Sequence, residues 1–298
     1  MNKSLETIKE IYKPYRYTLK GSATILETTS VNYVIKESNN NLRELFSYLK
    51  SRSFDNYPEI VDDSRKGIDV FKYIDDISYP NEQRANDLIN LIAKLHYKTS
   101  FYKDVTEDNF KEVYDNIKSN IDYLNEIYDK YYDDFFKSIY LSPSKYLFMN
   151  NYSKIKANLN FCQNELDNWY SLVKKLKKTR VAVIHNNLSL DHFLKDTKDY
   201  LISWNKSTID IPIIDIIKFY KKEYFNINFD NLIKNYLNIY SLSDDEKKLF
   251  FVLISLPNEI KFDENEFLSS IKVRENLDYI FKTENLIRPY YLENQKEE

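Results

Sequence analysis

The stretch VAVIHNNLSLDHFLKDTKDYLISWNKSTIDIPIIDIIKFY, residues 181–220, decides the fold of this 298-residue chain. It begins with a run of apolar residues, Val181–Ile184, which predicts a buried strand. A polar loop follows at residues 185–192. Two short strand-like pieces, 193–194 and 200–202, then flank a turn and predict a hairpin. The stretch therefore predicts a strand, a polar loop and a hairpin in that order.

Four segments of this stretch fall on one motif in the right order. They are His185-Asn186-Asn187, His192, Ser203-Trp204 and Asp210–Asp215. The motif reads approximately H-G-D-x-x-x-x-N, then a hydrophobic hairpin that ends in I-D-[FW], then a D-P-x-x-D-like segment. The stretch thus resembles the catalytic core of the aminoglycoside phosphotransferase and choline kinase-like family, and most of all the bacterial spore-coat kinase-like proteins. The order of strand, loop and hairpin in the motif is kept. The three positions at which the family has its base and its two metal ligands hold other residues.

The resemblance implies that an aspartate at position 187 would accept, or at least orient, the proton of a substrate hydroxyl. Asn187 has an amide in its place, and an amide has no basic lone pair near neutral pH. Loss of a general base typically lowers a rate by about 10²- to 10⁴-fold. His192 and Ser203 stand where the family has metal ligands, and Mg²⁺ prefers anionic oxygen. The three replacements predict a pseudokinase without a magnesium site, in which His185 braces the loop.

The N-terminal part of the chain has the alternation and β-branched residues of an antiparallel meander. Three strands are predicted at Tyr15–Leu19, Ala23–Glu27 and Val31–Lys36. An amphipathic helix at Asn41–Arg52 and a further strand at Ile68–Ile74 follow. This order of elements is that of a kinase small lobe.

Three residues of this small lobe are candidate nucleotide-binding residues by resemblance. Lys36 ends a predicted strand at the place of the family's phosphate-binding lysine, although a lysine at a strand end is usually only solvated. Glu44 lies on the following helix and is the candidate ion-pair partner of Lys36. Tyr73 falls in the hinge where the family binds adenine, and it could equally be a core aromatic. ATP binding is therefore left open.

The rest of the chain is predicted to be mostly helical. The run Leu91–His96 resembles a helix that the family places between hinge and catalytic loop. The predicted helices are 82–99, 106–140, 152–178, 216–224, 229–240, one from 243 and 264–281. The expected fold class is α+β, a two-lobed protein-kinase-like fold. We expect a small lobe at residues 1–80 and a helical lobe at 81–298 that contains the degenerate catalytic loop 185–205.

Composition limits the binding partners and the cellular compartment that we expect for this chain. Its net charge of −3 with mixed signs gives no support to nucleic-acid or membrane binding. The lone Cys162 excludes an internal disulfide and fits a reducing compartment. With only two glycines, Gly21 and Gly67, no glycine-rich phosphate loop can form. The chain lacks a secretion signal, with only a short helix expected at Leu5–Tyr12, so we expect a cytoplasmic location, or the spore coat if the organism sporulates.

Three functional readings follow from the sequence. The first is a non-catalytic binding or structural protein whose partner, a protein or a small molecule, is unknown. The second is an atypical small-molecule phosphotransferase that uses a relocated carboxylate, with Asp191 as the best stand-in and Asp196, Asp199 and Asp210 as others. The third is a nucleotide-binding switch that holds ATP without metal through Lys36 and the hinge.

Overall fold

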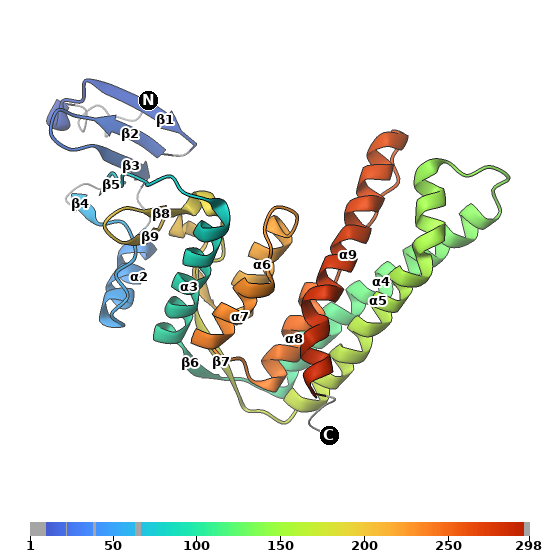
Figure 1. Ribbon diagram of the computed structural model, residues 1–298. Helices are drawn as coiled ribbons and strands as arrows, with labels where there is room; N and C mark the ends of the chain where they lie inside the picture. The colour runs from blue at the N-terminus through green and yellow to red at the C-terminus, as the bar shows by residue number, and fades with distance from the viewer. Residues whose placement is uncertain (1–9, 22, 38–39, 63–66, 295–298) are drawn as a thin grey trace. The chain divides into compact units, whose positions relative to one another are not determined.

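The computed structural model describes residues 10–21, 23–37, 40–62 and 67–294. Most of the helix predicted at Leu5–Tyr12 lies outside the described residues. The chain divides into two compact units (Figure 1), each built from two separate stretches. The first unit consists of Met1–Ser100 and Ala182–Asp210, and the second of Phe101–Val181 and Ile211–Glu298. This division differs from the predicted boundary at residue 80, which stays a prediction.

The first unit contains a five-stranded antiparallel sheet in the order β1-β2-β3-β5-β4. Its strands are β1 (Arg16–Lys20), β2 (Ala23–Glu27), β3 (Tyr33–Glu37), β4 (Ile60–Asp62) and β5 (Ile68–Lys72). The predicted meander is confirmed for β1, β2 and β3. Alternation buries Leu26, Ile35 and Val70 together on one face of the sheet.

Two helices complete the sheet-bearing part of the first unit. Helix α2 (Asn40–Ser51) buries Phe46 and Leu49, as its apolar spacing predicts. Helix α3 (Asn81–Thr99) matches the predicted helix 82–99 and buries Leu88, Ile92 and Leu95. Both helices therefore form because one face of each is apolar at helical spacing.

The 181–220 stretch supplies the remaining elements of the first unit. The end of β7 (Lys178–Ile184) pairs with β10 (Thr208–Asp210), and β8 (Phe193–Lys195) pairs with β9 (Asp199–Leu201). Two single 3₁₀ turns flank this hairpin, η1 (Leu190–His192) and η2 (Trp204–Lys206). The predicted strand, polar loop and hairpin are confirmed.

The second unit is helical except for one pair of strands. Strand β6 (Phe101–Asp104) pairs with the first half of β7. The helices are α4 (Glu107–Phe136), α5 (Pro143–Val173), α6 (Ile213–Glu223), α7 (Asp230–Ile239), α8 (Asp244–Ser255) and α9 (Glu266–Asn294). Helix α5 packs against α4, α8 and α9. In the described part of the chain, no helix is long and apolar enough to cross a bilayer.

Several predicted boundaries in the second unit are wrong for identifiable reasons. The helix predicted at 152–178 begins earlier, at Pro143 of α5, because a proline at the first helical position loses no intrahelical hydrogen bond. The same helix was predicted to end at residue 178, but α5 ends at Val173, and Lys178 begins β7, where it pairs with Asp104. Helix α4 begins as a closed capping box, since Asn109 Oδ1 accepts the Thr106 N–H at 2.9 Å.

Candidate functional site

The polar loop after β7 is fixed at its first residue, His185. This side chain is fully buried, and its Nε2 atom lies 2.8 Å from the carbonyl oxygen of Ile202 on the hairpin. Because a carbonyl can only accept, Nε2 carries the proton in this contact. The ring also meets Trp204 edge to face at a centroid distance of 4.9 Å. His185 therefore braces the loop against the hairpin.

Two residues of the site have a left-handed backbone. Asn186 has φ of 59° and Ser203 has φ of 67°. Asn186 occupies the glycine position of the H-G-D motif, and asparagine tolerates this conformation better than most other residues. Ser203 precedes Trp204 and opens the turn η2. Both residues thus hold a left-handed conformation that favours glycine while carrying another side chain.

Asn187 and His192 are joined across the loop. His192 Nδ1 lies 2.7 Å from the main-chain oxygen of Asn187, so Nδ1 carries a proton and donates it to that oxygen. The loop between them is held by the turn η1, where the His192 N–H donates to the Ser189 carbonyl at 3.0 Å. The Ile202 N–H in turn donates to the His192 carbonyl at 2.9 Å. Because Nδ1 of His192 carries the proton in the neutral ring, Nε2 is the ring nitrogen that can accept a hydrogen bond.

These side chains do not form a magnesium site. The three positions supply an amide, an imidazole whose Nδ1 is committed to a carbonyl, and a neutral hydroxyl. Mg²⁺ takes hard oxygen ligands and normally at least one carboxylate. Within the described ranges, His, Cys, Asp and Glu side chains nowhere gather in a group of three that could hold a metal ion. The residues present therefore do not fit the ion that the fold family uses.

Three of the four candidate stand-in carboxylates are exposed. Asp191 is exposed in η1, where its N–H donates to Ser189 Oγ at 3.4 Å. Asp196 and Asp210 are also exposed. Asp199 lies 3.7 Å from Lys195 Nζ and is therefore paired with a cation. The structure thus joins His192 to Asn187 and places the rings of His185 and His192 with their centroids 6.3 Å apart.

The predicted ion pair between Lys36 and Glu44 is not formed. Glu44 is exposed, because a rotation of about 100° per residue places it roughly opposite the buried Phe46 on α2. The neighbouring Arg43 pairs instead with the buried Asp69 of β5 at 3.0 Å. Lys36 itself is half-buried at the end of β3, and this burial lowers the pKa of its ammonium group. Its nucleotide-binding role stays a prediction.

Tyr73 follows β5 and is half-buried. Its N–H donates to the Asn32 carbonyl at 2.9 Å, so this amide extends the sheet. The segment after it, residues 74–80, leads to α3. The contribution of Tyr73 to a nucleotide site stays a prediction.

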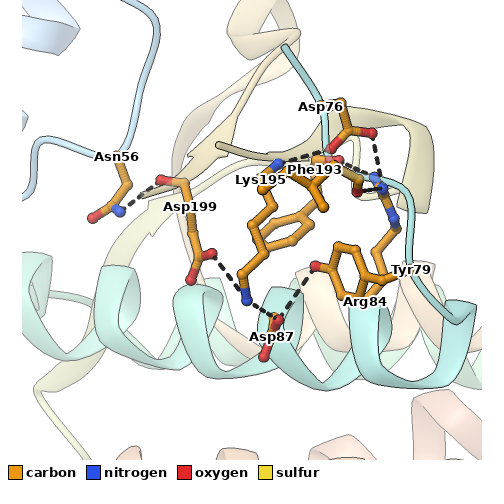
Figure 2. Close-up of polar contacts among 9 residues, drawn as sticks. Asn56, Asp76, Tyr79, Arg84, Asp87, Phe193, Lys195 and Asp199 are labelled. Atoms are coloured by element: carbon orange, nitrogen blue, oxygen red, sulfur yellow. Dashed lines mark hydrogen bonds and ion pairs between the residues drawn. The ribbon is translucent and has the colours of Figure 1, made fainter. Parts of the chain in front are cut away.

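A polar network that the sequence did not indicate holds this segment to the hairpin (Figure 2). Arg84 of α3 is 8% exposed and donates to the Phe193 carbonyl at 2.7 Å, the Ile77 carbonyl at 3.1 Å and Asp76 Oδ2 at 2.8 Å. Asp76 Oδ1 also accepts the Lys195 N–H at 2.9 Å. Arg84 therefore satisfies two carbonyl oxygens and one carboxylate, which is expected of a buried guanidinium.

Lys195 forms the second half of this network. Its ammonium group lies 2.6 Å from Asp87 Oδ2 on α3 and 3.7 Å from Asp199 on the hairpin. The same Asp87 oxygen accepts the Tyr79 hydroxyl at 3.2 Å. Burial first, and the Asp87 carboxylate next, raise the pKa of Tyr79. The contacts that join α3 and the 74–80 segment to the hairpin link residues more than a hundred positions apart, so no local pattern could have predicted them.

The segment after α2 also reaches the hairpin. Asn56 Nδ2 donates to the Asp199 carbonyl at 2.8 Å, and the Leu201 N–H donates to the Asn56 carbonyl at 2.9 Å. Trp204 lies edge-on to Phe46 and Phe54, with centroids 6.1 and 6.3 Å apart. The hairpin that lies between His192 and Ser203 is therefore held by contacts from α2, α3 and the 74–80 segment.

Comparison with known proteins identifies this arrangement. No family model matches the sequence, and no curated protein matches it significantly. A crystal structure of an aminoglycoside phosphotransferase from Alicyclobacillus acidocaldarius superposes with a TM-score of 0.68, over 93% of this chain and 92% of that chain, at 8% identity. This chain has the aminoglycoside phosphotransferase fold. The predicted α+β, two-lobed protein-kinase-like class is confirmed. At this identity the likeness establishes the fold alone.

Two further structures of this kind show weaker similarity. Spectinomycin phosphotransferase bound to AMP matches with a TM-score of 0.49 and 13% identity, over 99% of this chain and 93% of that chain. A choline kinase from Streptococcus pneumoniae matches with a TM-score of 0.46 and 14% identity, over 96% of this chain and 98% of that chain. Scores this low carry no argument of their own.

Proposed function

We propose that this protein is a pseudokinase, a kinase-fold protein that does not transfer phosphoryl groups and acts as a binding or structural protein. The observation that carries the proposal is the contact between His192 Nδ1 and the Asn187 carbonyl at 2.7 Å. It commits Nδ1 of His192 as a donor to the main chain, at a position where the family has a metal ligand, while residue 187 carries a neutral amide at the position of the family's base.

Each replacement removes a separate contribution to phosphoryl transfer. Without a base at position 187, the rate falls by about 10²- to 10⁴-fold. Without a metal at His192 and Ser203, charge that develops on the transferred group is not neutralised. Losses of this size at three positions leave no measurable transfer.

The braces of the loop support a role that needs the fold but not the reaction. His185, Arg84 and the Asn56 segment keep the loop and hairpin in place. A chain that keeps these contacts keeps a defined surface for a protein or small-molecule partner. We place the protein in the cytoplasm, or in the coat if the source organism forms spores.

Lys36 favours a second candidate function, the binding of a nucleotide without metal. Its ammonium group is half-buried, has a lowered pKa, and forms no ion pair within the part of the chain that the structure describes. A partly desolvated cation of this kind is stabilised by an anion such as a nucleotide phosphate.

Thermal unfolding with ATP separates these functions. The protein is heated alone, with ATP and EDTA, and with ATP and Mg²⁺ or Mn²⁺. No shift in melting temperature supports the scaffold, since a ligand stabilises only a fold that binds it. A shift in EDTA that Lys36→Met removes and Lys72→Met keeps supports the nucleotide switch. A shift that requires the metal contradicts both and favours the atypical phosphotransferase.

A further inference from the structure

A cavity in the second unit lies between α6, α9 and the connection from α6 to α7. Its volume is about 280 Å³, close to the lower end of the range of about 300–1,000 Å³ that is typical of small-molecule sites. Residues 224–230 line it, together with Tyr220 of α6 and Lys282, Asn285 and Leu286 of α9. A cavity of this size suits a small ligand.

Direct contacts hold α6 and α9 together beside this cavity. The Tyr220 hydroxyl lies 2.8 Å from Thr283 Oγ1, and the ring centroids of Tyr220 and Tyr279 are 5.7 Å apart. The Tyr224 hydroxyl donates to the Glu275 carbonyl at 3.3 Å. The two helices are therefore fixed to each other by the protein's own side chains.

Part of the lining is apolar. Ile227, Phe229 and Leu286 line the cavity and are almost completely buried. Phe229 packs edge-on against Phe219 and Tyr220, with centroids 5.4 and 5.0 Å apart. An apolar group of a ligand that enters the cavity can therefore be removed from water against these side chains.

Lys282 provides a positive charge in the lining. Its ammonium group donates to the carbonyl oxygens of Tyr224 and Phe225 at 3.1 and 3.4 Å, and it lies 5.8 and 5.0 Å from the centroids of their rings. An ammonium group has three N–H donors. Within the part of the chain that the structure describes, Lys282 has no ion pair and its third donor has no acceptor. The charge is therefore held in place with one donor left for a ligand.

Asp230 provides a negative charge in the same lining. It lies in the first turn of α7, where the helix dipole favours a carboxylate, and its N–H donates to Asn228 Oδ1 at 2.8 Å. Among the described residues, its carboxylate forms no ion pair and no side-chain hydrogen bond. The same holds for the amide of Asn285, which lies three residues after Lys282 on the same side of α9. The lining thus keeps both donors and acceptors for a ligand.

The two opposite charges select the class of ligand. A simple anion would meet Lys282 but be repelled by Asp230, and a simple cation would meet Asp230 but be repelled by Lys282. An uncharged ligand would leave both charges without an opposite charge. A free α-amino acid carries a carboxylate and an ammonium group at neutral pH, so it complements both.

We propose that this cavity binds a free α-amino acid with an apolar side chain. The carboxylate accepts a hydrogen bond from Lys282, and the ammonium group donates to Asp230. The side chain packs against Ile227, Phe229 and Leu286. The inference is independent of whether the protein transfers phosphate.

Isothermal titration calorimetry of the full chain with L-leucine and L-phenylalanine tests this. We expect a dissociation constant below about 1 mM for at least one of the two. N-acetyl-L-leucine lacks the ammonium group and L-leucinamide lacks the carboxylate, so each should bind at least about tenfold more weakly than L-leucine. Glycine should also bind more weakly, because it has no side chain to bury.

Substitutions locate the site. Lys282→Met and Asp230→Asn should each weaken the binding of the tighter amino acid by at least about tenfold. The matched controls are Lys272→Met, on the same helix α9, and Asp244→Asn, in the first turn of α8. Both controls keep the charges of the cavity and should bind like the wild type. Melting temperatures report whether each variant folds.

Four results overturn the proposal. The first is no binding of either amino acid at concentrations up to about 10 mM. N-acetyl-L-leucine that binds as tightly as L-leucine overturns it in favour of an anion site, and L-leucinamide that does so overturns it in favour of a cation site. Binding that Lys282→Met and Asp230→Asn leave unchanged places the amino acid elsewhere. The comparison of ligands uses the wild type, so it holds even if a variant does not fold.

Discussion

His192 Nδ1 lies 2.7 Å from the main-chain oxygen of Asn187, across the loop where a kinase of this fold holds its base and a metal ligand. The oxygen can only accept, so the hydrogen bond requires a proton on Nδ1. His185 has the opposite arrangement, because its Nε2 faces the Ile202 oxygen at 2.8 Å. The two histidines of the loop therefore hold different tautomers.

The first prediction concerns these tautomers. In the neutral state we expect His192 as the Nδ1–H form and His185 as the Nε2–H form, since each proton is fixed by a carbonyl. Nitrogen-15 chemical shifts of the ring atoms measure this, with His96→Gln, His185→Gln and His192→Gln used for assignment. A His192 in the Nε2–H form contradicts the described loop.

The second prediction concerns the network of Arg84. Arg84→Met should lower the free energy of unfolding by about 3 kcal/mol, because it leaves the Phe193 carbonyl and Asp76 without their cationic donor. Urea unfolding measures the change. The matched control is Arg288→Met, which breaks the Arg288–Glu284 pair of two exposed side chains and should cost less than about 0.5 kcal/mol. Equal effects of the two substitutions contradict the role given to Arg84.

The third prediction concerns the charge of Lys36. Burial lowers its pKa from the ordinary 10.5, so the protonated lysine destabilises the folded state at neutral pH. This penalty is fully present below the lowered pKa and is lost as the pH rises towards the unfolded value. Lys36→Met should therefore raise the melting temperature at pH 7, and the gain should shrink in alkaline buffer.

Lys72 provides the control for this substitution, because it is exposed on the neighbouring strand β5. Lys72→Met should leave the melting temperature almost unchanged at every pH. A lower melting temperature for Lys36→Met at pH 7 means that the ammonium group is stabilising, which excludes a desolvated lysine at this position.

The fourth prediction concerns Cys162 on α5. The side chain is fully buried, and burial raises the pKa of its thiol to about 12. The thiolate is the reactive form, so a disulfide reagent at pH 8 should label the native protein only as fast as the second unit opens. Labelling in urea should be complete at once. Stoichiometric labelling of the native protein within seconds contradicts this packing.

Much of the fold was predictable because its signals are local. Alternation in Ala23–Glu27 and apolar spacing in α2 and α3 depend on neighbouring residues, and each element was found near its observed bounds. The loop and hairpin were predictable from the order of motif segments around His185 and Trp204. In these cases sequence pattern and tertiary packing agree.

The remaining features depend on tertiary contacts. Strands β6 and β10 are three or four residues long and exist because they pair with β7. The Arg84 network joins α3 to the hairpin over more than a hundred residues of chain. The Lys36–Glu44 pair was predicted from the resemblance to a kinase small lobe, and it is not formed because the phase of α2 turns Glu44 outward.

The central claim is that the chain keeps the frame of a phosphotransferase without its chemistry. The most direct measurement is the formation of ADP from ATP with Mg²⁺ or Mn²⁺, with water and with hydroxyl-bearing acceptors. We predict no ADP above the amount found with heat-denatured protein. Metal-dependent ADP formation that Asp191→Ala abolishes and Asp196→Ala preserves would contradict the account.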